Sequence, residues 1–228
     1  MIMLIHITGW VLFCAAIALL IAVALLMQWL GGFLVTRDVL VRDFTLLDLE
    51  LASTEMEIDN TLKGIAQLEP ATAGKVGRSL KGILYADFLF MPAAYGAIFI
   101  ACMKVAWKMP ESGQVYFSIL GWLQVAAWIS DIVENIYLLN KTGKIRNGIA
   151  GALLPFSMYQ RLAVVKWGCS LLGVVSTLSA LLYFWISGWY RGESLGYLLV
   201  IVAELAIFAV LMRMVKKPGN AWRAAVHQ

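Results

Sequence analysis

The sequence has little charge, few cysteines and almost no histidine. Charged residues make up 14% of the 228 residues, whereas an ordinary soluble domain carries roughly 25%. Cys14, Cys102 and Cys169 stand singly within apolar segments, and the two histidines lie near opposite ends of the chain. These scarcities argue against a disulfide framework and against a zinc site built from Cys and His pairs. We interpret the three cysteines as small buried hydrophobes.

Motifs of the commonest enzymes are missing as well. The chain contains no Gly-x-Ser-x-Gly, no P-loop and no His-Glu-x-x-His, which argues against the usual serine hydrolases, NTPases and zinc proteases. The net charge is +4, but no basic and aromatic motif typical of nucleic-acid binding accompanies it. The sequence therefore assigns no catalytic residue and no nucleic-acid partner, and it leaves other kinds of catalysis open.

Apolar residues dominate what remains, at 61% of the chain. A membrane-spanning helix needs roughly 20 mainly apolar residues, and five segments meet that length: 9–35, 83–107, 115–139, 163–187 and 194–212. The first is too long for the apolar part of a signal peptide and has no basic residues before it. We therefore predict an all-α integral membrane protein, with residues 1–228 forming one transmembrane helical domain of five spans.

Lysine and arginine are distributed unevenly between the predicted loops. Of the 18 basic residues, 15 lie in three segments. These are loop 36–82, the region between the third and fourth spans together with the start of the fourth, and tail 213–228. By the positive-inside rule these segments face the cytoplasm. The N-terminus is then outside and the C-terminus inside, and we predict a multi-pass protein of a bacterial inner membrane.

The long first loop shows the periodicity of amphipathic helices. Its apolar residues recur mostly at intervals of three, four or seven positions: Phe44, Leu47, Leu51, Ile58, Leu62 and Ile65. Thr54 and Glu57 fit a capping box, so a second helix is expected to start there and to run to Pro70. Acidic residues on the other faces disfavour binding to anionic lipid. Packing across the cytoplasmic mouth of the bundle is therefore favoured over a surface position.

Five ionisable residues fall within predicted spans: Asp87, Asp131, Glu134, Lys166 and Glu204. Each costs about 2.5–3.5 kcal/mol at the centre of a membrane helix, so each requires a reason. Counted from the nearest basic residue at a helix end, all five lie roughly 8–15 Å into the membrane on the cytoplasmic side. Four helices are thus expected to contribute to one charged layer, and Asn135 joins it because it shares a helix face with Asp131.

This layer holds four carboxylates and one ammonium group, a formal excess of three negative charges. Three compensations are open: protonation of the acids, a divalent cation held by Asp87, Asp131 and Glu134, or basic side chains that reach in from the helix ends. The basic candidates are Arg78, Lys81 and Arg161. No other cofactor is indicated.

Two interpretations of the layer remain open. The charged residues form either a structural ion pair that sets the helix register, or a site that binds a headgroup, a cation or a proton. Tyr95, Tyr137 and Tyr159 are candidate hydrogen-bond donors to a ligand, although anchoring at the membrane interface is the more frequent role of tyrosine. Glu204 is a secondary candidate for the layer, as is Arg161, and Glu204 is also a candidate for contact with another subunit or a membrane-protein partner.

Two stretches together carry a resemblance. "LLDLELASTEMEIDNTL" at 46–62 and "YADFLFMPAAYG" at 85–96 are similar to a family of uncharacterised bacterial multi-pass membrane proteins. "DIVEN" at 131–135 matches a later segment of that family, and Lys166 matches a lysine at the start of its next helix. The family has no established activity. The resemblance therefore implies the multi-pass fold and a role for Asp87, Asp131, Glu134, Asn135 and Lys166, but no function.

The expected function is binding of a lipid-like or amphiphilic molecule in a polar pocket at the cytoplasmic leaflet. Asp131 and Glu134 would hold a headgroup or cation, Asp87 would face them, and Lys166 would neutralise a phosphate or carboxylate. If the protein is an enzyme, one of these acids is the proton carrier. A proton- or cation-coupled transporter and a non-catalytic assembly or scaffold subunit are the alternatives.

Overall fold

The computed structural model describes residues 2–37, 41–146, 154–188 and 193–214, almost all of them helical. Its elements are, in chain order, α1 (Ile2–Gly31), β1 (Val35–Arg37), β2 (Val41–Asp43), α2 (Leu46–Glu50), α3 (Glu55–Ala66), α4 (Pro70–Ala106), α5 (Glu111–Arg146), α6 (Phe156–Ser187) and α7 (Glu193–Met214). The predicted tail 213–228 lies outside the described residues from position 215 onward.

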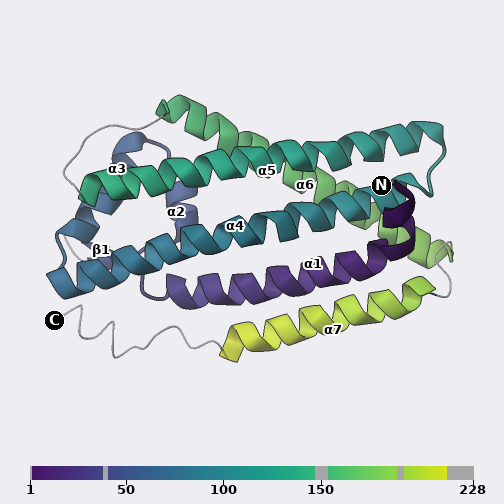
Figure 1. Cartoon of the computed structure of the whole chain (residues 1–228), viewed down its shortest axis with the longest axis horizontal. Helices are drawn as coiled ribbons and strands as arrows, with labels where there is room; N and C mark the ends of the chain where they lie inside the picture. Colours follow the sequence, from purple (N-terminus) through teal and green to yellow (C-terminus); the bar gives the residue numbers. More distant parts are fainter. Residues whose placement is uncertain (1, 38–40, 147–153, 189–192, 215–228) are drawn as a thin grey trace.

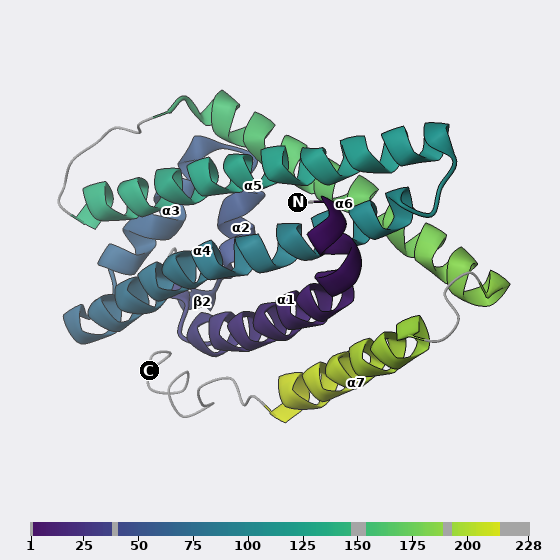
Figure 2. The ribbon, with the colours of Figure 1, turned by 45° about the vertical axis from the view of Figure 1, so that its right-hand side comes forward.

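Four helices within the described ranges are long and apolar enough to cross a membrane: α1, α4, α5 and α6. They pack side by side, and α4 contacts all three of the others. The fifth predicted span corresponds to α7, whose apolar stretch Val202–Leu211 is shorter. Helix α7 packs beside α1 at the edge of the bundle (Figures 1 and 2).

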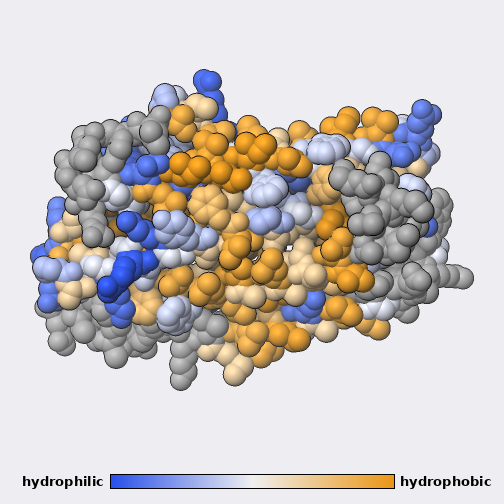
Figure 3. Space-filling view, viewed as in Figure 1, coloured by the Kyte–Doolittle hydropathy of each residue, from blue (hydrophilic) through white to orange (hydrophobic). Residues whose placement is uncertain are grey.

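The outer surface of the bundle is apolar. Hydrophobic residues cover the middle of the molecule in Figure 3, and hydrophilic residues gather mainly toward its two ends. Individual side chains agree with this view, because Val164 is 74% and Ile186 is 85% exposed. Helices that are apolar on their outward as well as their inward faces are typical of membrane spans. The long apolar helices are therefore compatible with a membrane protein.

Small residues bring the spans close together. Ala93, Ala97 and Ala101 are buried along α4, where small side chains let neighbouring helices approach. On α6, a Cβ at Gly173 would collide with the side-chain amide of Gln124. Gln124 is fully buried on α5, and its amide donates to the Cys169 carbonyl of α6 at 3.0 Å.

The long loop folds onto one end of the bundle, where Phe44, Leu49, Ile58, Leu62 and Ile65 join a core with α4, α5 and α6. Two details differ from expectation. An antiparallel hairpin forms from residues 35–37 and 41–43. The sequence instead predicts the end of a span at 35 and a helical loop after it. The predicted apolar stripe is also wrong at Leu47 and Leu51, which are exposed.

The helix ends explain the wrong part of that stripe. Thr45 and Asp48 form a capping box, so α2 begins at Leu46 and is only five residues long. This start turns Leu49 and Glu50 inward. The predicted start at Thr54 is confirmed by its side chain, which accepts the Glu57 N–H. Helix α3 then ends at Ala66, and Pro70 opens α4.

Helix α4 therefore begins well before the predicted span at 83. Proline is favoured in the first turn of a helix, and α4 runs from there without interruption for 37 residues, with Pro92 in its interior. Its first turns pack against α3. Lys141 of α5 also holds α3, through Glu55 at 2.7 Å and Asp59 at 2.9 Å.

Candidate functional site

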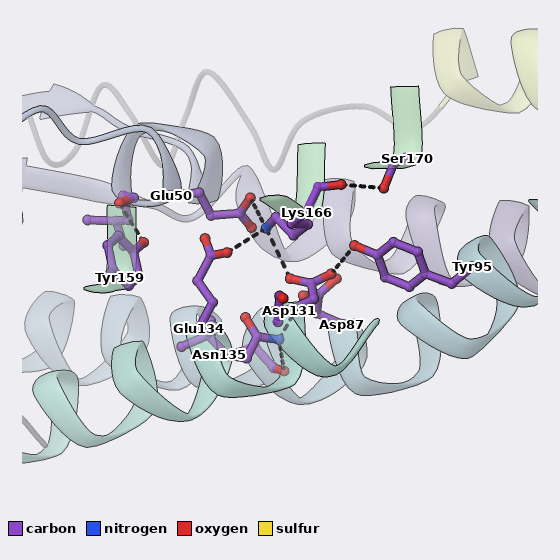
Figure 4. A network of polar contacts seen from close by, with 12 residues as sticks. Glu50, Asp87, Tyr95, Asp131, Glu134, Asn135, Tyr159, Lys166 and Ser170 are labelled. Carbon is purple, nitrogen blue, oxygen red and sulfur yellow. Dashed lines mark hydrogen bonds and ion pairs between the residues drawn. The ribbon is translucent and has the colours of Figure 1, made fainter. Parts of the chain in front are cut away.

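Lys166 lies at the centre of a buried group of carboxylates (Figure 4). Its Nζ is 2.8 Å from Glu50, 3.0 Å from Asp131 and 3.0 Å from Glu134. All four side chains are at least nine-tenths buried, and Glu134 is fully buried. One ammonium group thus joins α2, α5 and α6.

Local helix geometry places these acids. Asp131 and Glu134 are three positions apart on α5, so their side chains leave the same helix face. Lys166 enters from α6, which packs along α5. Glu50 occupies the last position of α2, and the short capped helix brings it down to Lys166 from the loop.

Two further hydrogen bonds extend the group toward α4. The Tyr95 hydroxyl donates to the second oxygen of Asp131 at 2.8 Å. Asn135 donates to Asp87 at 2.7 Å and reaches the Leu84 carbonyl at 3.4 Å. We call the seven residues Glu50, Asp87, Tyr95, Asp131, Glu134, Asn135 and Lys166 the buried network.

The structure thus brings together all five primary residues predicted from the sequence. The formal excess of three negative charges is also present, but the members differ from those predicted. Glu50 is the fourth carboxylate, and Glu204 is not part of the network. Removing charges from water costs several kcal/mol for each ion. The hydrogen bonds from Lys166, Tyr95 and Asn135 offset part of this cost.

The secondary candidates divide between the network and other places. Tyr95 belongs to it. Glu204 is half-buried on α7, which packs beside α1, and one of its carboxylate oxygens accepts no hydrogen bond from the described residues. Arg161 is exposed on α6. Neither Glu204 nor Arg161 makes an ion pair with the network.

The interfacial role favoured for the three tyrosines is wrong. Tyr95, Tyr137 and Tyr159 are all buried inside the bundle. The Tyr159 hydroxyl donates to the Leu49 carbonyl at 2.9 Å, which fixes the end of α2 next to Glu50. The Tyr137 hydroxyl accepts a hydrogen bond from Lys141 at 3.2 Å.

The geometry favours an ammonium group over a divalent cation among these acids. The Nζ of Lys166 already lies within 3.0 Å of Glu50, Asp131 and Glu134. In the part of the chain that is described, no three His, Cys, Asp or Glu side chains are grouped so as to hold a metal ion. Lys166 is also fully engaged, so it is not available to neutralise an incoming phosphate.

Some acceptors in the network lack donors. Glu134 makes its ion pair with Lys166, yet neither of its oxygens accepts a well-aligned hydrogen bond from the described residues. The side-chain oxygen of Asn135 also lacks a donor in the same part of the chain. Buried acceptors are nearly always satisfied in folded proteins. The network therefore has a shortage of donors as well as an excess of negative charge.

An open groove of about 630 Å³ reaches the edge of the network. We call it the acidic groove, because Glu50 is the one charged residue in the part of its lining that the structure describes. The segment after α2 and one face of α6 form its walls: Glu50, Leu51, Ala52, Ser53, Gln160, Ala163, Val164, Trp167, Gly168 and Leu171. Its surface is mainly apolar, and the exposed side chains of Val164 and Leu171 extend it along the outer face of α6.

Glu50 differs electrostatically from an ordinary loop carboxylate. Burial raises its pKa above the usual 4.5, while the positive charge and hydrogen bond of Lys166 act in the opposite direction. Negative charge on Asp131 adds a smaller upward effect. A positively charged ligand would favour the ionised form of Glu50.

Glu50 is the residue that the sequence interpretation missed. The sequence pattern places it with the acids on the polar faces of the loop helices. The pattern that could have identified it is Thr45-x-x-Asp48, a capping arrangement that fixes the start of α2. That start gives the helical phase in which Leu49 and Glu50 face the bundle and Leu47 faces away.

Comparison of the chain with protein-family models, with curated proteins and with solved structures finds no match. The functional argument therefore depends on the geometry of the chain itself.

Proposed function

We propose that the protein binds a lipid-like amphiphile in the acidic groove, with a cationic, amine-bearing headgroup placed at Glu50. The observation that carries the proposal is that Glu50 belongs both to the buried network and to the lining of the acidic groove. This carboxylate is bonded to the buried Lys166 and also lines an apolar groove. A groove of this kind offers charge at one end and apolar surface along the rest.

The charge of the network supports an ammonium headgroup. Lys166 faces three carboxylates, and Asp87 lies close to them. A second cation at Glu50 would reduce the negative excess without displacing Lys166. A primary ammonium group also brings N–H donors, which a network with unsatisfied acceptors lacks. An anionic headgroup would meet repulsion at the same place.

The apolar walls support a chain attached to that headgroup. Val164, Trp167 and Leu171 are exposed on α6, and three or four positions separate successive members, so they form one helical face. Gly168 leaves this face open, because a Cβ there would meet no atom within 4 Å. An acyl chain can therefore lie along α6 below Glu50.

Native mass spectrometry of the protein from mixed-lipid nanodiscs tests the proposal. The probe is phosphatidylethanolamine, and phosphatidylcholine with the same acyl chains is the comparison, because its quaternary ammonium has no N–H donor. We expect the wild-type protein to retain phosphatidylethanolamine preferentially. Loss of a buried charge partner costs at least about 2 kcal/mol, so Glu50→Gln should reduce the retained fraction by more than tenfold.

Two variants make this test specific. Gly168→Leu adds a large side chain to the groove at a position where a Cβ meets no atom within 4 Å. It should reduce retention in the same way, with Glu50 unchanged. Glu69→Gln removes an exposed carboxylate that makes no capping hydrogen bond, and it should behave like the wild type. Equal retention of both lipids by the wild type, or unchanged retention in Gly168→Leu, would contradict the proposal.

Proton-coupled transport is a second candidate, and the observation that favours it is Glu134. A fully buried carboxylate with no well-aligned donor among the described residues can gain and lose a proton at low structural cost. A transporter reconstituted in liposomes should move protons or cations, and Glu134→Gln should stop that movement while the protein still folds. If Glu134→Gln fails to accumulate, the ion pair with Lys166 is structural, as expected for a scaffold subunit.

We propose five spans in a bacterial inner membrane, with the N-terminus outside. Helix α7 has 22 residues, about 33 Å of helix and enough to cross a bilayer. In Figure 1, α1, α5 and α7 run in one direction and α4 and α6 in the other. Alternating directions support five successive crossings, and the distribution of Lys and Arg supports a cytoplasmic position for the network end.

A further inference from the structure

A second groove lies at the end of the bundle where α3 packs against α4 and α5. It encloses about 490 Å³ between α3, the start of α4 and the end of α5. We call it the basic groove, because its charged lining residues are Arg78 and Lys81. The other lining residues are Leu62, Ile65, Ala66, Pro70, Ala73, Gly74, Gly77 and Thr142.

Arg78 and Lys81 are three positions apart on α4, so they share one helix face. Neither makes an ion pair within the described residues, and α3 contributes only apolar residues to the described groove lining. Glu55 and Asp59 of that helix are engaged with Lys141 instead. The groove therefore has two cations available for an external anion.

The depth of the groove matches the headgroup level of a bilayer. A bilayer with its headgroup regions is about 40–45 Å thick, or roughly 27–30 residues of straight helix. Counted back from the exposed Trp107 at the far end of α4, this length ends near Arg78 and Lys81. The two cations thus lie where lipid phosphates are, and the apolar part of the groove offers space beside them.

Two glycines leave this space open. A Cβ at Gly74 or at Gly77 would meet no atom within 4 Å. Leu62 and Ile65 form part of the opposite wall on α3. The combination of a cationic edge and an apolar floor fits the phosphate and the glycerol end of a phospholipid.

We propose that the basic groove binds a phospholipid with an anionic headgroup, its phosphate held by Arg78 and Lys81. Basic pockets between membrane helices at the cytoplasmic side are known sites for such headgroups. The inference does not depend on the proposed function, since it concerns other residues, another groove and a ligand of opposite charge. A lipid held here would join α3, α4 and α5.

The test uses the full-length protein in nanodiscs that contain phosphatidylglycerol and phosphatidylcholine, with retained lipid measured by native mass spectrometry. We expect the wild type to retain phosphatidylglycerol preferentially. Arg78→Gln with Lys81→Gln should reduce the retained fraction by roughly tenfold or more, since two charge-assisted contacts are lost. Arg37→Gln with Arg42→Gln removes two exposed charges from the hairpin and should leave retention unchanged.

Gly77→Leu provides a second test with all charges in place. It fills the basic groove and should reduce retention of phosphatidylglycerol without affecting phosphatidylethanolamine at the acidic groove. Equal loss in both double variants would show general surface attraction, and full retention in Gly77→Leu would place the lipid elsewhere. Displacement of phosphatidylglycerol by excess inorganic phosphate alone would show a free-phosphate site. Each of these results would overturn the proposal.

Discussion

At the scale of single residues, Lys166 is the side chain on which the buried network depends. Its ammonium group is the one cation within 3.0 Å of Glu50, Asp131 and Glu134 among the described residues. Removal of one partner from a buried ion pair costs roughly 3–5 kcal/mol, because the remaining charge stays desolvated. We therefore expect Lys166→Met to lower the unfolding temperature strongly in detergent, or to prevent accumulation.

A second substitution separates charge from packing in this prediction. If the loss arises from uncompensated carboxylates, Glu134→Gln added to Lys166→Met should restore part of the stability. Lys63→Met, on an exposed face of α3, should change the unfolding free energy by no more than about 0.5 kcal/mol. Absence of any rescue by Glu134→Gln would indicate that the lysine stem, and not its charge, supports the fold.

The carboxyl group of Glu50 makes stability depend on pH. Its pKa in the folded protein is raised above 4.5 by burial, so the folded chain binds this proton more readily than the unfolded chain does. Between 4.5 and the raised value, the unfolding free energy should therefore fall as the pH rises. Thermal unfolding measured from about pH 5 to about pH 8 should show this slope in the wild type.

Glu50→Gln isolates that contribution, since Asp131 and the other network acids remain. The variant should unfold at a higher temperature than the wild type toward neutral pH, and the difference should shrink as the pH falls. An unfolding temperature that is lower in Glu50→Gln throughout would show that the bond to Lys166 outweighs the cost of burial.

The sequence identifies residues of the network where charge interrupts an apolar segment. Asp87, Asp131, Glu134 and Lys166 are conspicuous for that reason, because each carries a known cost inside a membrane helix. Glu50 is not conspicuous, since acids are ordinary in a polar loop. The Thr45-x-x-Asp48 pattern fixes the helical phase that turns Glu50 inward, but its partner Lys166 lies 116 positions away in the sequence, and no short-range pattern predicts that contact.

At the scale of elements, the hairpin and α3 meet through an unusually close contact at Gly64. A Cβ at this position would collide with the Thr36 hydroxyl and the Arg37 carbonyl. Thr36 also donates to the Thr61 carbonyl at 2.7 Å, which holds β1 against α3. We expect Gly64→Ala to lower the unfolding temperature, because backbone atoms must move to accept the methyl group.

Gly74→Ala is the matched control for this substitution. Its added methyl group meets no atom within 4 Å, and alanine is more favourable than glycine in a helix by about 1 kcal/mol. It should leave the unfolding temperature unchanged or raise it. A destabilisation of equal size in both variants would rule out the close contact as the cause.

The sequence predicts the central parts of the long helices well, but it predicts the residues at which they begin and end less well. Hydropathy marks the part of a helix that meets lipid, whereas the helix itself continues for as long as its backbone hydrogen bonds do. Helix α4 therefore starts at Pro70, far outside its apolar segment, and α1 ends at Gly31 before the apolar residues stop. The strands β1 and β2 have three residues each, too few for a period-two pattern to appear.

At the scale of the whole molecule, the five-span arrangement predicts which positions face each side of the membrane. Gln67 lies in the loop before α4, and Pro110 lies in the loop after it. If α4 crosses the membrane, these two loops lie on opposite sides. The hairpin with Arg42 belongs to the side of Gln67. In the proposed topology, the excess of basic residues puts that side in the cytoplasm.

Single cysteines introduced into a cysteine-free background test this arrangement in intact cells. Cysteine at Gln67 or Arg42 should resist a membrane-impermeant maleimide until the membrane is opened, and cysteine at Glu111 should react from outside. All three positions are exposed, so differences in labelling report the side of the membrane and not burial. If residue 67 is labelled from outside, the orientation is reversed, and the network and both grooves face the outer leaflet. If residues 67 and 111 react from the same side, α4 does not cross the membrane, and the lipid-facing interpretation of α6 fails with it.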